Sequence, residues 1–288
     1  MASPASLASG APDRSKPPLP EPLLHPVVDS HCHLDMTDSS WLATDRALAE
    51  AASVGVTRIV QIGCDLPGAR WAVQAAQRYD VVVAAVALHP NEAPRLASSG
   101  KLDEAFAEIE TLAASSDRVR AVGETGLDYF RTEEDGRDAQ HESFRRHIDL
   151  AKRLNKTLVI HDRDSHADVI RLLDEEGVPD RVVMHCFSGD AAFARECLDR
   201  GAFLSFSGTV TFKNAQPLRD ALAVTPLDRI LVETDAPFLT PAPYRGRTNA
   251  SYLVPITLAS MAVTREIELE ALCLAVDENT EVAFGGHW

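Results

Sequence analysis

The stretch Val27-Val28-Asp29-Ser30-His31-Cys32-His33-Leu34-Asp35 is a short apolar segment that runs into two histidines separated by one residue. Successive residues of a β-strand point to opposite faces, so the side chains of His31 and His33 are expected to point the same way. Two imidazoles on one face can bind one metal ion. For an isolated pair, two hydrogen-bonded core histidines are the alternative, and the pattern of the remaining chain decides between them.

Seven further segments rich in apolar residues follow, at residues 57–63, 81–89, 119–124, 157–161, 181–185, 202–207 and 230–235. Stretches with helical periodicity lie between them, most clearly at residues 41–53, 69–79 and 139–155. Strands that alternate with helices predict a parallel sheet, and strands that are apolar almost throughout predict that both faces are covered. Eight such units in about 264 residues predict a TIM barrel, with a doubly wound open sheet as the alternative.

The first 24 residues differ in composition from the rest of the chain. They are rich in Pro, Ala and Ser, and such a segment buries too little apolar area to offset the entropy of ordering. We therefore expect a flexible tail over residues 1–24 and a single domain over residues 25–288. Charged residues and prolines interrupt the tail, which argues against a secretory signal, and no run is long enough to span a membrane. No dinucleotide-binding or P-loop glycine motif is present.

Charge and cysteine content narrow the class of protein. Five scattered cysteines without a C-x-x-C pair fit free thiols in a reducing compartment, so we expect a cytoplasmic protein. Separately, we expect a monomer. A formal net charge of −15 argues against a protein that coats nucleic acid through a broad basic surface. A polyanionic substrate would have to be held locally, by bound metal ions and a few arginines.

Polar residues fall at the carboxyl ends of six of the predicted strands, and in a TIM barrel these ends converge on the active-site face. Taken singly, each residue has a simpler explanation. A carboxylate could be solvated in a loop or could cap a turn before proline, and a histidine could serve only to set the conformation of a loop. Five of only ten histidines in these positions favour one shared site instead. The residues are His31, His33, His89, Glu124, His161, His185 and Asp235.

Four imidazoles and two carboxylates are more than one tetrahedral zinc ion needs, so two ions bridged by a carboxylate use this set better. Two adjacent ions suit the attack of water on a phosphodiester. Gly123 and Gly126 permit close backbone approach beside Glu124. For His89 we expect contact with substrate rather than metal. Asp128 is a loop acid that either contacts substrate or stays solvated, and Glu233 is expected to be hydrogen-bonded.

The chain resembles the TatD-related metal-dependent deoxyribonucleases of the amidohydrolase superfamily from about residue 26 to its end. As an ordered set the matching motifs are highly specific. They are DSHCHLD (29–35), GETGLDYF (123–130), LVIHDRD (158–164), VVMHCFSGD (182–190), GTVTFKNA (208–215), ILVETDAPFLTP (230–241) and YRGRTN (244–249).

This resemblance implies two divalent ions, Mg²⁺ first among them, with Mn²⁺ and Zn²⁺ as other choices. A first ion would be held by His31, His33, Glu124 and Asp235, and a second by Glu124, His161 and His185. It further implies a deoxyribonuclease that trims DNA from 3′ ends or single strands, in which Glu124, Asp235 and His89 are the expected catalytic residues. Asp128, Lys213 and Arg245 are candidate substrate contacts.

The sequence departs from the family pattern at two places, both in loops that are expected to contact substrate. Ala87 stands where the family usually has glycine, and Asn249 is followed by Ala250 and Ser251 rather than continuing to a proline. A hydrolase of another ester or amide bond, including a D-aminoacyl ester on tRNA, is the alternative within enzymes. A partner-binding protein that retains a structural metal is the alternative outside them.

Overall fold

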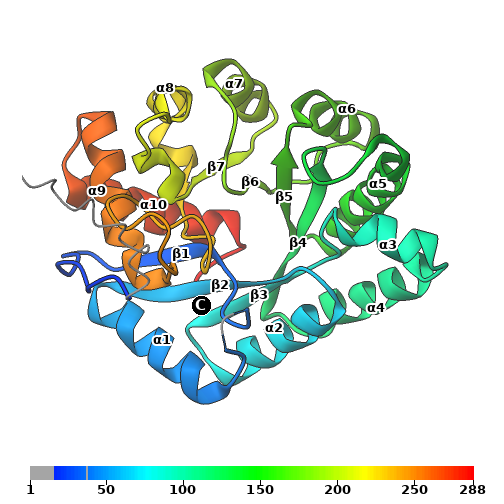
Figure 1. The fold of residues 1–288 in the computed structure, drawn as a ribbon, viewed down its shortest axis with the longest axis horizontal. Coiled ribbons are helices and arrows are strands. Elements are labelled where there is room, and N and C mark those ends of the chain that lie inside the picture. Colours follow the sequence, from blue (N-terminus) through cyan, green and yellow to red (C-terminus); the bar gives the residue numbers. More distant parts are fainter. Residues whose placement is uncertain (1–15, 37) are drawn as a thin grey trace, which may run out of the picture.

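Eight parallel strands pair in chain order and form a barrel in the computed structural model, which describes residues 16–36 and 38–288 (Figure 1). The TIM barrel predicted from the sequence is confirmed. The strands are β1 (Val27–Cys32), β2 (Val56–Gly63), β3 (Val82–Val86), β4 (Val119–Asp128), β5 (Thr157–Arg163), β6 (Val182–Met184), β7 (Phe203–Phe206) and β8 (Ile230–Val232).

Helices surround the strands, because each crossover between parallel neighbours returns along the outside of the sheet (Figure 1). The helix expected at residues 41–53 has these bounds, and the other two expected helices shift by one to three residues at each end. The helices are α1 (Trp41–Ser53), α2 (Leu66–Arg78), α3 (Glu92–Ser98), α4 (Leu102–Ala114), α5 (Arg137–Leu154), α6 (His166–Glu176), α7 (Ala191–Asp199), α8 (Gln216–Val224), α9 (Val254–Arg265) and α10 (Leu269–Ala283).

The barrel closes where the first strand meets the segment after the last. Cys32 and Ala236 form a parallel bridge, and the backbone N–H of His33 donates to the carbonyl of Ala236 at 2.8 Å. One residue earlier, the N–H of Asp235 donates to the carbonyl of His31 at 2.9 Å. These bonds bring Asp235 beside the two histidines, 200 residues away in the chain.

Apolar side chains fill both the inside of the barrel and the layer between strands and helices. The inner cluster contains one or two residues from each of the eight strands, among them Val28, Val60, Val159 and Leu231, all fully buried. A larger cluster joins the outer faces of the strands to the helices. This double covering explains why the strands are apolar almost throughout.

The C-terminal residues plug the barrel at the amino ends of its strands. Phe284 is fully buried in the inner cluster, and Trp288 packs against that cluster. On β2, the guanidinium of Arg58 lies over the Trp288 ring and bonds to Asp277 at 2.6 Å and Glu281 at 2.8 Å. This end of the barrel is therefore closed by packing and by paired charges.

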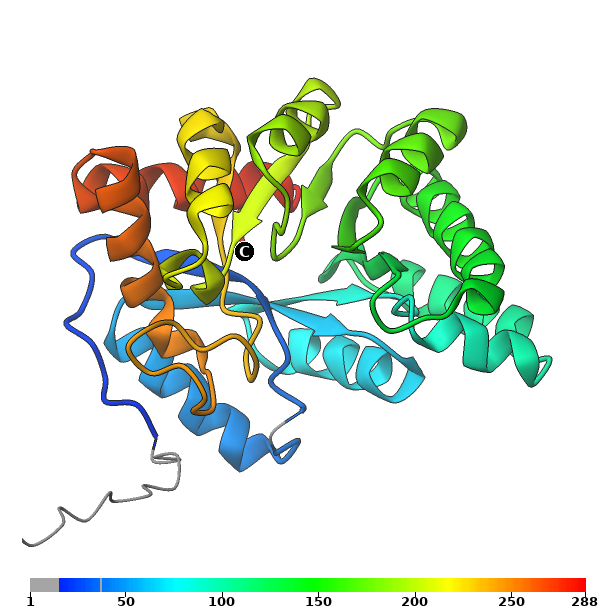
Figure 2. The same cartoon turned by 45° about the horizontal axis from the view of Figure 1, so that its top comes forward.

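Part of the expected tail lies against the barrel. Residues 16–24 have no helix or strand but run along the outside, beside α1 (Figure 2). The Tyr252 hydroxyl donates to the carbonyl of Pro17, Lys16 pairs with Glu50, and the N–H of Leu23 donates to Val54. From residue 16 onward the segment is thus ordered by polar contacts that its composition does not reveal. Residues 1–15 of the expected tail lie outside the described residues.

Within residues 16–36 and 38–288, none of the helices has the length and apolar character that crossing a membrane requires.

Candidate metal centre

The predicted site residues meet at the carboxyl ends of the strands, although they do not all end a strand. Glu124 lies four residues before the end of β4, because that strand continues to Asp128, and His161 lies two residues before the end of β5. Asp235, in contrast, stands three residues after the end of β8. The expectation that each residue would terminate its strand is therefore wrong in register, while the convergence itself is present.

A close approach between β4 and β5 sets the position of Glu124. Gly126 pairs with His161 across the two strands and has a φ of +139°, and a Cβ atom there would lie 2.0 Å from the His161 carbonyl oxygen. A Cβ on Gly123 would lie 2.5 Å from the Val159 side chain. Only glycine fits such positions, so the two glycines that flank Glu124 bring it next to the histidine on the neighbouring strand.

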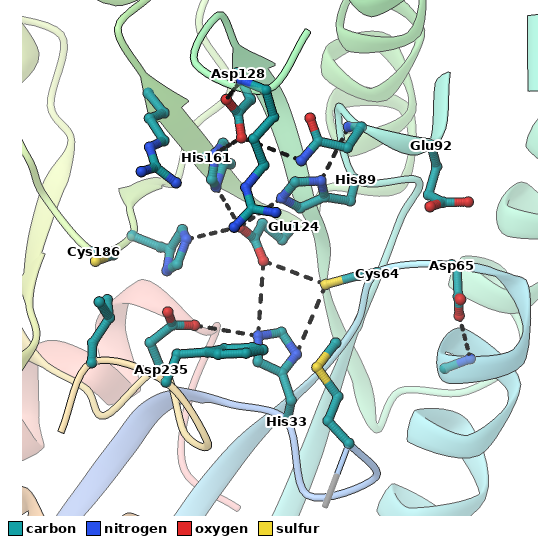
Figure 3. Close-up of a pocket in the computed structure, with 18 of the residues that line it drawn as sticks. His33, Cys64, Asp65, His89, Glu92, Glu124, Asp128, His161, Cys186 and Asp235 are labelled. Atoms are coloured by element: carbon teal, nitrogen blue, oxygen red, sulfur yellow. Dashed lines mark hydrogen bonds and ion pairs between the residues drawn. The ribbon is translucent and has the colours of Figure 1, made fainter. Parts of the chain in front are cut away.

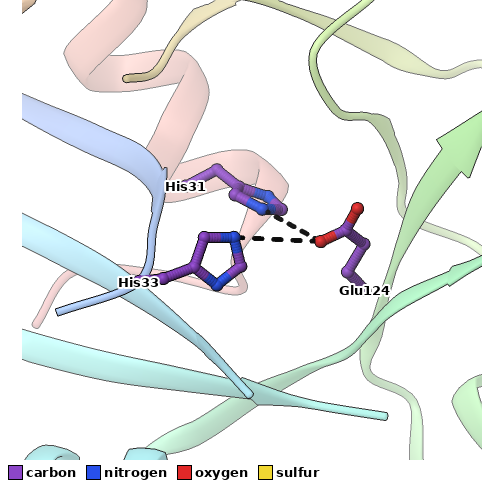
Figure 4. Close-up of side chains that lie close together, drawn as sticks. All are labelled: His31, His33 and Glu124. Carbon is purple, nitrogen blue, oxygen red and sulfur yellow. Dashed lines mark ion pairs between the residues drawn. The ribbon is translucent and has the colours of Figure 1, made fainter. Parts of the chain in front are cut away.

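The two carboxylate oxygens of Glu124 face different groups of histidines. Oε2 lies 3.4 Å from Nε2 of His31 and 4.0 Å from Nε2 of His33, and Figure 4 shows both rings directed at this oxygen. Oε1 lies 2.6 Å from Nδ1 of His161 and 2.9 Å from Nε2 of His185. One carboxylate thus stands between two separate ligand groups.

Asp235 completes the group on the Oε2 side. Its Oδ1 lies 3.3 Å from Nε2 of His33 and 3.7 Å from Nε2 of His31. Figure 3 shows Glu124 between His33 and Asp235 on one side and His161 and Asp128 on the other. The six predicted ligands therefore come together around one carboxylate.

Hydrogen bonds orient the rings of His33 and His185 so that Nε2 points into the site. Nδ1 of His33 is 3.2 Å from the carbonyl of Ile62, which can only accept, so Nδ1 carries a proton and Nε2 faces Oδ1 of Asp235 at 3.3 Å. Nδ1 of His185 likewise donates to Glu233 at 3.1 Å. A carbonyl or carboxylate on the outer nitrogen is the usual support of a metal-binding histidine.

Asp128 supports His161 rather than standing in solvent. It is buried, and its Oδ2 lies 3.4 Å from Nε2 of His161 and accepts from the side-chain amide of Asn91 at 3.2 Å. Its other oxygen accepts the backbone N–H groups of Phe130 and Arg131. The geometry therefore makes Asp128 a support for His161, and because Asp128 also lines the cavity, its contact with substrate stays a prediction.

His89 differs from the other histidines in which nitrogen is free. Its Nδ1 accepts the backbone N–H of Asn91 at 3.1 Å, so the neutral ring carries its proton on Nε2. That Nε2 lies 3.5 Å from Oε1 of Glu124. His89, Glu124 and His161 lie close enough together to share an ion, and contact of His89 with substrate through its Nε2 proton stays a prediction.

The donor set fits metal ions. His31 is completely buried, and neither of its ring nitrogens makes a hydrogen bond. Burial and the neighbouring charge of His185 lower the pKa of His31 to about 3, so the ring is neutral near pH 7 and has a lone pair to offer. His31, His33 and Glu124 lie close enough together to share one ion. An ion at this position would satisfy a buried group that the protein leaves without a partner.

The two acidic ligands remain ionised despite their burial. Burial by itself would raise the pKa of Glu124, but the charges of His185 and His89 and the hydrogen bonds from His161 and His185 hold it well below its usual range. Burial opposes ionisation of Asp235 in the same way, and the hydrogen bond and charge of His33 outweigh it, so its pKa is also lowered. These carboxylates in turn outweigh burial and raise the pKa of His33, His161 and His185, so an ion that binds here displaces protons from the rings.

A cavity of about 1080 Å³ opens over these residues. Arg131 and Arg163 line it, and sequence reasoning did not single them out although both fall within or beside the quoted motifs. Lys213 and Arg245, predicted as substrate contacts, are exposed and do not line it. The Arg245 guanidinium instead stacks on the Phe212 ring at 4.3 Å.

A thiol also lies beside the centre. The Cys64 Sγ is 3.4 Å from Oε2 of Glu124, and burial, followed by the charge of Glu124, raises its pKa well above the usual range. Nothing in the sequence around Cys64 indicated this position, because it follows β2, whose end carries no charged residue.

Comparisons with known proteins agree with the fold and the donor set. The family model described as TatD related DNase matches residues 28–285. The chain is 46% identical over 267 residues to an uncharacterized metal-dependent hydrolase, TatD, of Mycobacterium tuberculosis, covering 91% of this chain and 99% of that protein. It is 41% identical over 256 residues to the uncharacterized metal-dependent hydrolase YcfH of Escherichia coli K12, covering 88% and 93%. The crystal structure of YJJV, a TatD homologue from Escherichia coli, matches with a TM-score of 0.82 at 26% identity, covering 91% of this chain and 98% of that one.

Proposed function

The chain belongs to the TatD-related DNase family and is a metal-dependent hydrolase, and from this premise we propose that it is a deoxyribonuclease that removes nucleotides from the 3′ ends of single-stranded DNA. The observation that carries the proposal is the position of Glu124, whose two oxygens face two histidine groups. A bridging carboxylate of this kind suits two ions a few ångströms apart.

We assign the ligands by the oxygen of Glu124 that each faces. His31, His33 and Asp235 would hold one ion on the Oε2 side, and His161 and His185 would hold a second on the Oε1 side. When bound, two divalent ions lower the pKa of water and polarise the phosphate oxygens. Nitrogen and oxygen donors together accept Mn²⁺ and Zn²⁺ as well as Mg²⁺, so several ions have to be compared.

Side chains of the protein would carry out the proton transfer and would stabilise the charge on the phosphate. Asp235 is an ionised acid that lines the cavity, and it is placed to accept a proton from the attacking water. His89 presents its Nε2 proton near Oε1 of Glu124, where it can donate a hydrogen bond to a phosphate oxygen. Catalysis by this arrangement needs no covalent intermediate with the protein.

The mouth of the cavity supports a substrate that carries nucleobases. Trp71 and Phe238 line it, and 51% of the Phe238 surface is exposed. Bases of a single strand stack on aromatic side chains without regard to sequence. Paired bases offer no free face, which favours single strands or frayed ends as the substrate.

The test is a nuclease assay on end-labelled single-stranded DNA, with metal-free protein reloaded with Mg²⁺, Mn²⁺ or Zn²⁺ and its bound metal measured. We expect shortening from the 3′ end and about two ions per chain. His31→Ala and Glu124→Gln should each lower the rate about 10³-fold, which is about 4 kcal/mol. His25→Ala, which removes an imidazole outside the cavity, should keep the parent rate.

Equal digestion by the parent and both site variants would rule out the assigned site. Hydrolysis of lactones, amides or D-aminoacyl-tRNA in preference to DNA by the same protein would replace the proposed substrate with another ester or amide. Two bound ions without turnover of any of these substrates would favour a partner-binding protein that retains its metal.

A further inference from the structure

Two arginines stand at one end of a cavity that is otherwise acidic. Among the described residues that line it, Arg131 and Arg163 are the basic ones apart from histidine. Seven acidic residues line it as well: Asp35, Asp65, Glu92, Glu124, Asp128, Asp162 and Asp235. Two divalent ions would offset four of these seven negative charges and hold one phosphate at the centre, so any further phosphate needs cations of its own. We propose that Arg131 and Arg163 form a clamp for a second phosphate, adjacent to the one that is hydrolysed.

Arg163 is held in a fixed orientation. It is the last residue of β5, two residues after His161, so both side chains lie on the same face of the strand. Its guanidinium carbon lies 3.9 Å above the centre of the Phe130 ring. Stacking of this kind fixes the plane of the guanidinium and leaves its N–H groups free at the edge.

Arg131 is placed by the turn that follows β4. Oδ1 of Asp128 accepts the backbone N–H groups of Phe130 at 3.1 Å and Arg131 at 2.9 Å. The same carboxylate contacts His161 through its other oxygen. One buried acid therefore ties the clamp to the Oε1 side of the metal centre.

Both guanidinium groups are available for an anion. In the part of the chain that the structure describes, neither forms an ion pair with a carboxylate, whereas Arg145, Arg171 and Arg200 on the outer helices each pair with at least one. In a protein with a net charge of −15, two unpaired arginines in a cavity are unusual. Arginine suits this task because its donors match two phosphate oxygens at once.

The opposite end of the cavity has a different character. Phe238 packs edge-on against His33, and Met36 and Trp71 also line the cavity, so these residues provide apolar surface rather than charge. A substrate with one phosphate fills only the centre, and a substrate with two adjacent phosphates also reaches the clamp. The inference rests on the proposed function and narrows the substrate class to phosphodiester chains and terminally phosphorylated dinucleotides.

The test compares three thymidine dinucleotides: dTpdT, and the same molecule with an added 5′ or 3′ phosphate. Dissociation constants are measured by calorimetry on the Ca²⁺-loaded protein, so that binding is read without turnover. We expect one of the phosphorylated forms to bind about tenfold more tightly than dTpdT. Arg163→Gln and Arg131→Gln should each remove most of this preference, and Arg163→Lys should keep part of it.

Arg195→Gln is the matched control, because Arg195 is exposed on α7 and does not line the cavity. It should keep the full preference, and thermal unfolding followed by circular dichroism checks that all variants fold. Equal binding of the three dinucleotides by the parent overturns the clamp, and so does an unchanged preference in both cavity variants.

Hydrolysis of bis(p-nitrophenyl) phosphate with Mn²⁺ separates this inference from the proposed function, because that diester carries no second phosphate. We expect the parent and the matched control Arg195→Gln to hydrolyse it at equal rates. Hydrolysis without a preference for a second phosphate rejects the clamp alone. A preference in binding without hydrolysis of any diester supports the clamp and rejects the proposed function.

Discussion

The two ends of the barrel treat buried polar groups in opposite ways. At the amino ends of the strands, Phe284 fills the interior and the buried Arg58 bonds to both Asp277 and Glu281. At the carboxyl ends, His31 is also buried but its nitrogens lack hydrogen bonds, and Glu124 stands among five histidines. The first end is complete by itself, while the second is complete only with ions.

Backbone conformation shows the same contrast. Six non-glycine residues of the described chain have a left-handed backbone. Asn155 and Glu266 end helices α5 and α9, where this conformation is common. The other four, Asp164, Cys186, Asp235 and Leu239, lie in the loops that follow strands. Local strain of this kind is concentrated at functional sites. The loops at the carboxyl ends of the strands therefore adopt backbone conformations that lower stability but position the side chains of the site.

Removing the plug should have the largest effect on stability. Phe284→Ala leaves a cavity in the fully buried inner cluster and should lower the free energy of unfolding by about 3–5 kcal/mol. Urea unfolding measures this, and Val282→Ala is the control, because 60% of the Val282 surface is exposed. Metal stoichiometry should not change in either variant. A loss of bound metal in Phe284→Ala would mean that the two ends are not independent.

Removing the ions should destabilise only the carboxyl end. At a free concentration ten times the dissociation constant, each ion that binds only the folded protein adds about 1.4 kcal/mol, so two ions add about 2.8 kcal/mol. Thermal and urea unfolding with and without chelator should therefore differ by about this amount in the parent and in Phe284→Ala. In Glu124→Gln the difference should vanish, and persistence of the full difference there would place the ions elsewhere.

A smaller, pH-dependent effect should come from a histidine that supports the site from behind. His147 on α5 is buried, accepts the N–H of Leu88 at Nε2 and donates to the carbonyl of Ser143 at Nδ1. Burial lowers its pKa to about 4, below its usual value of 6.5. The unfolded chain therefore binds the proton more readily, so stability is present above pH 6.5 and is lost as pH falls toward 4.

For this one group the loss between pH 8 and pH 5 should be about 2 kcal/mol. His147→Gln keeps a donor and an acceptor but does not titrate. From pH 8 to pH 5, the free energy of unfolding of this variant should therefore fall by about 2 kcal/mol less than that of the parent. Urea unfolding at each pH, with chelator present, measures both proteins. Parallel curves would show that His147 is not the group that responds.

Much of the fold and of the donor set was predictable because both depend on local patterns. Apolar strands at regular spacing predict the barrel, and the carboxyl ends of parallel strands meet whatever their exact length. His31, His161 and His185 could therefore be placed together before any coordinates. Strand ends were less predictable. For example, β4 continues four residues past Glu124, because residues 125–128 pair with residues 160–163 of β5.

The roles of side chains that depend on distant partners were not predictable. Asp128 reads as a loop acid in the sequence, and only its contacts with His161 and the 130–131 backbone make it a support. Lys213 and Arg245 were favoured by their motifs but lie outside the cavity, whereas Arg131 and Arg163 line it. Which charged side chain faces a cavity depends on how loops from different strands pack.

Local patterns in the chain are thus enough to predict that eight strands converge and that imidazoles and carboxylates lie where they meet, because hydrophobic periodicity and residue type are local properties. The position of Glu124 between two histidine groups, the ring nitrogen that each histidine directs at a carboxylate, and the places of Arg131 and Arg163 all required the folded structure. These features are set by distances between residues far apart in the chain, and such distances exist only once the barrel has closed.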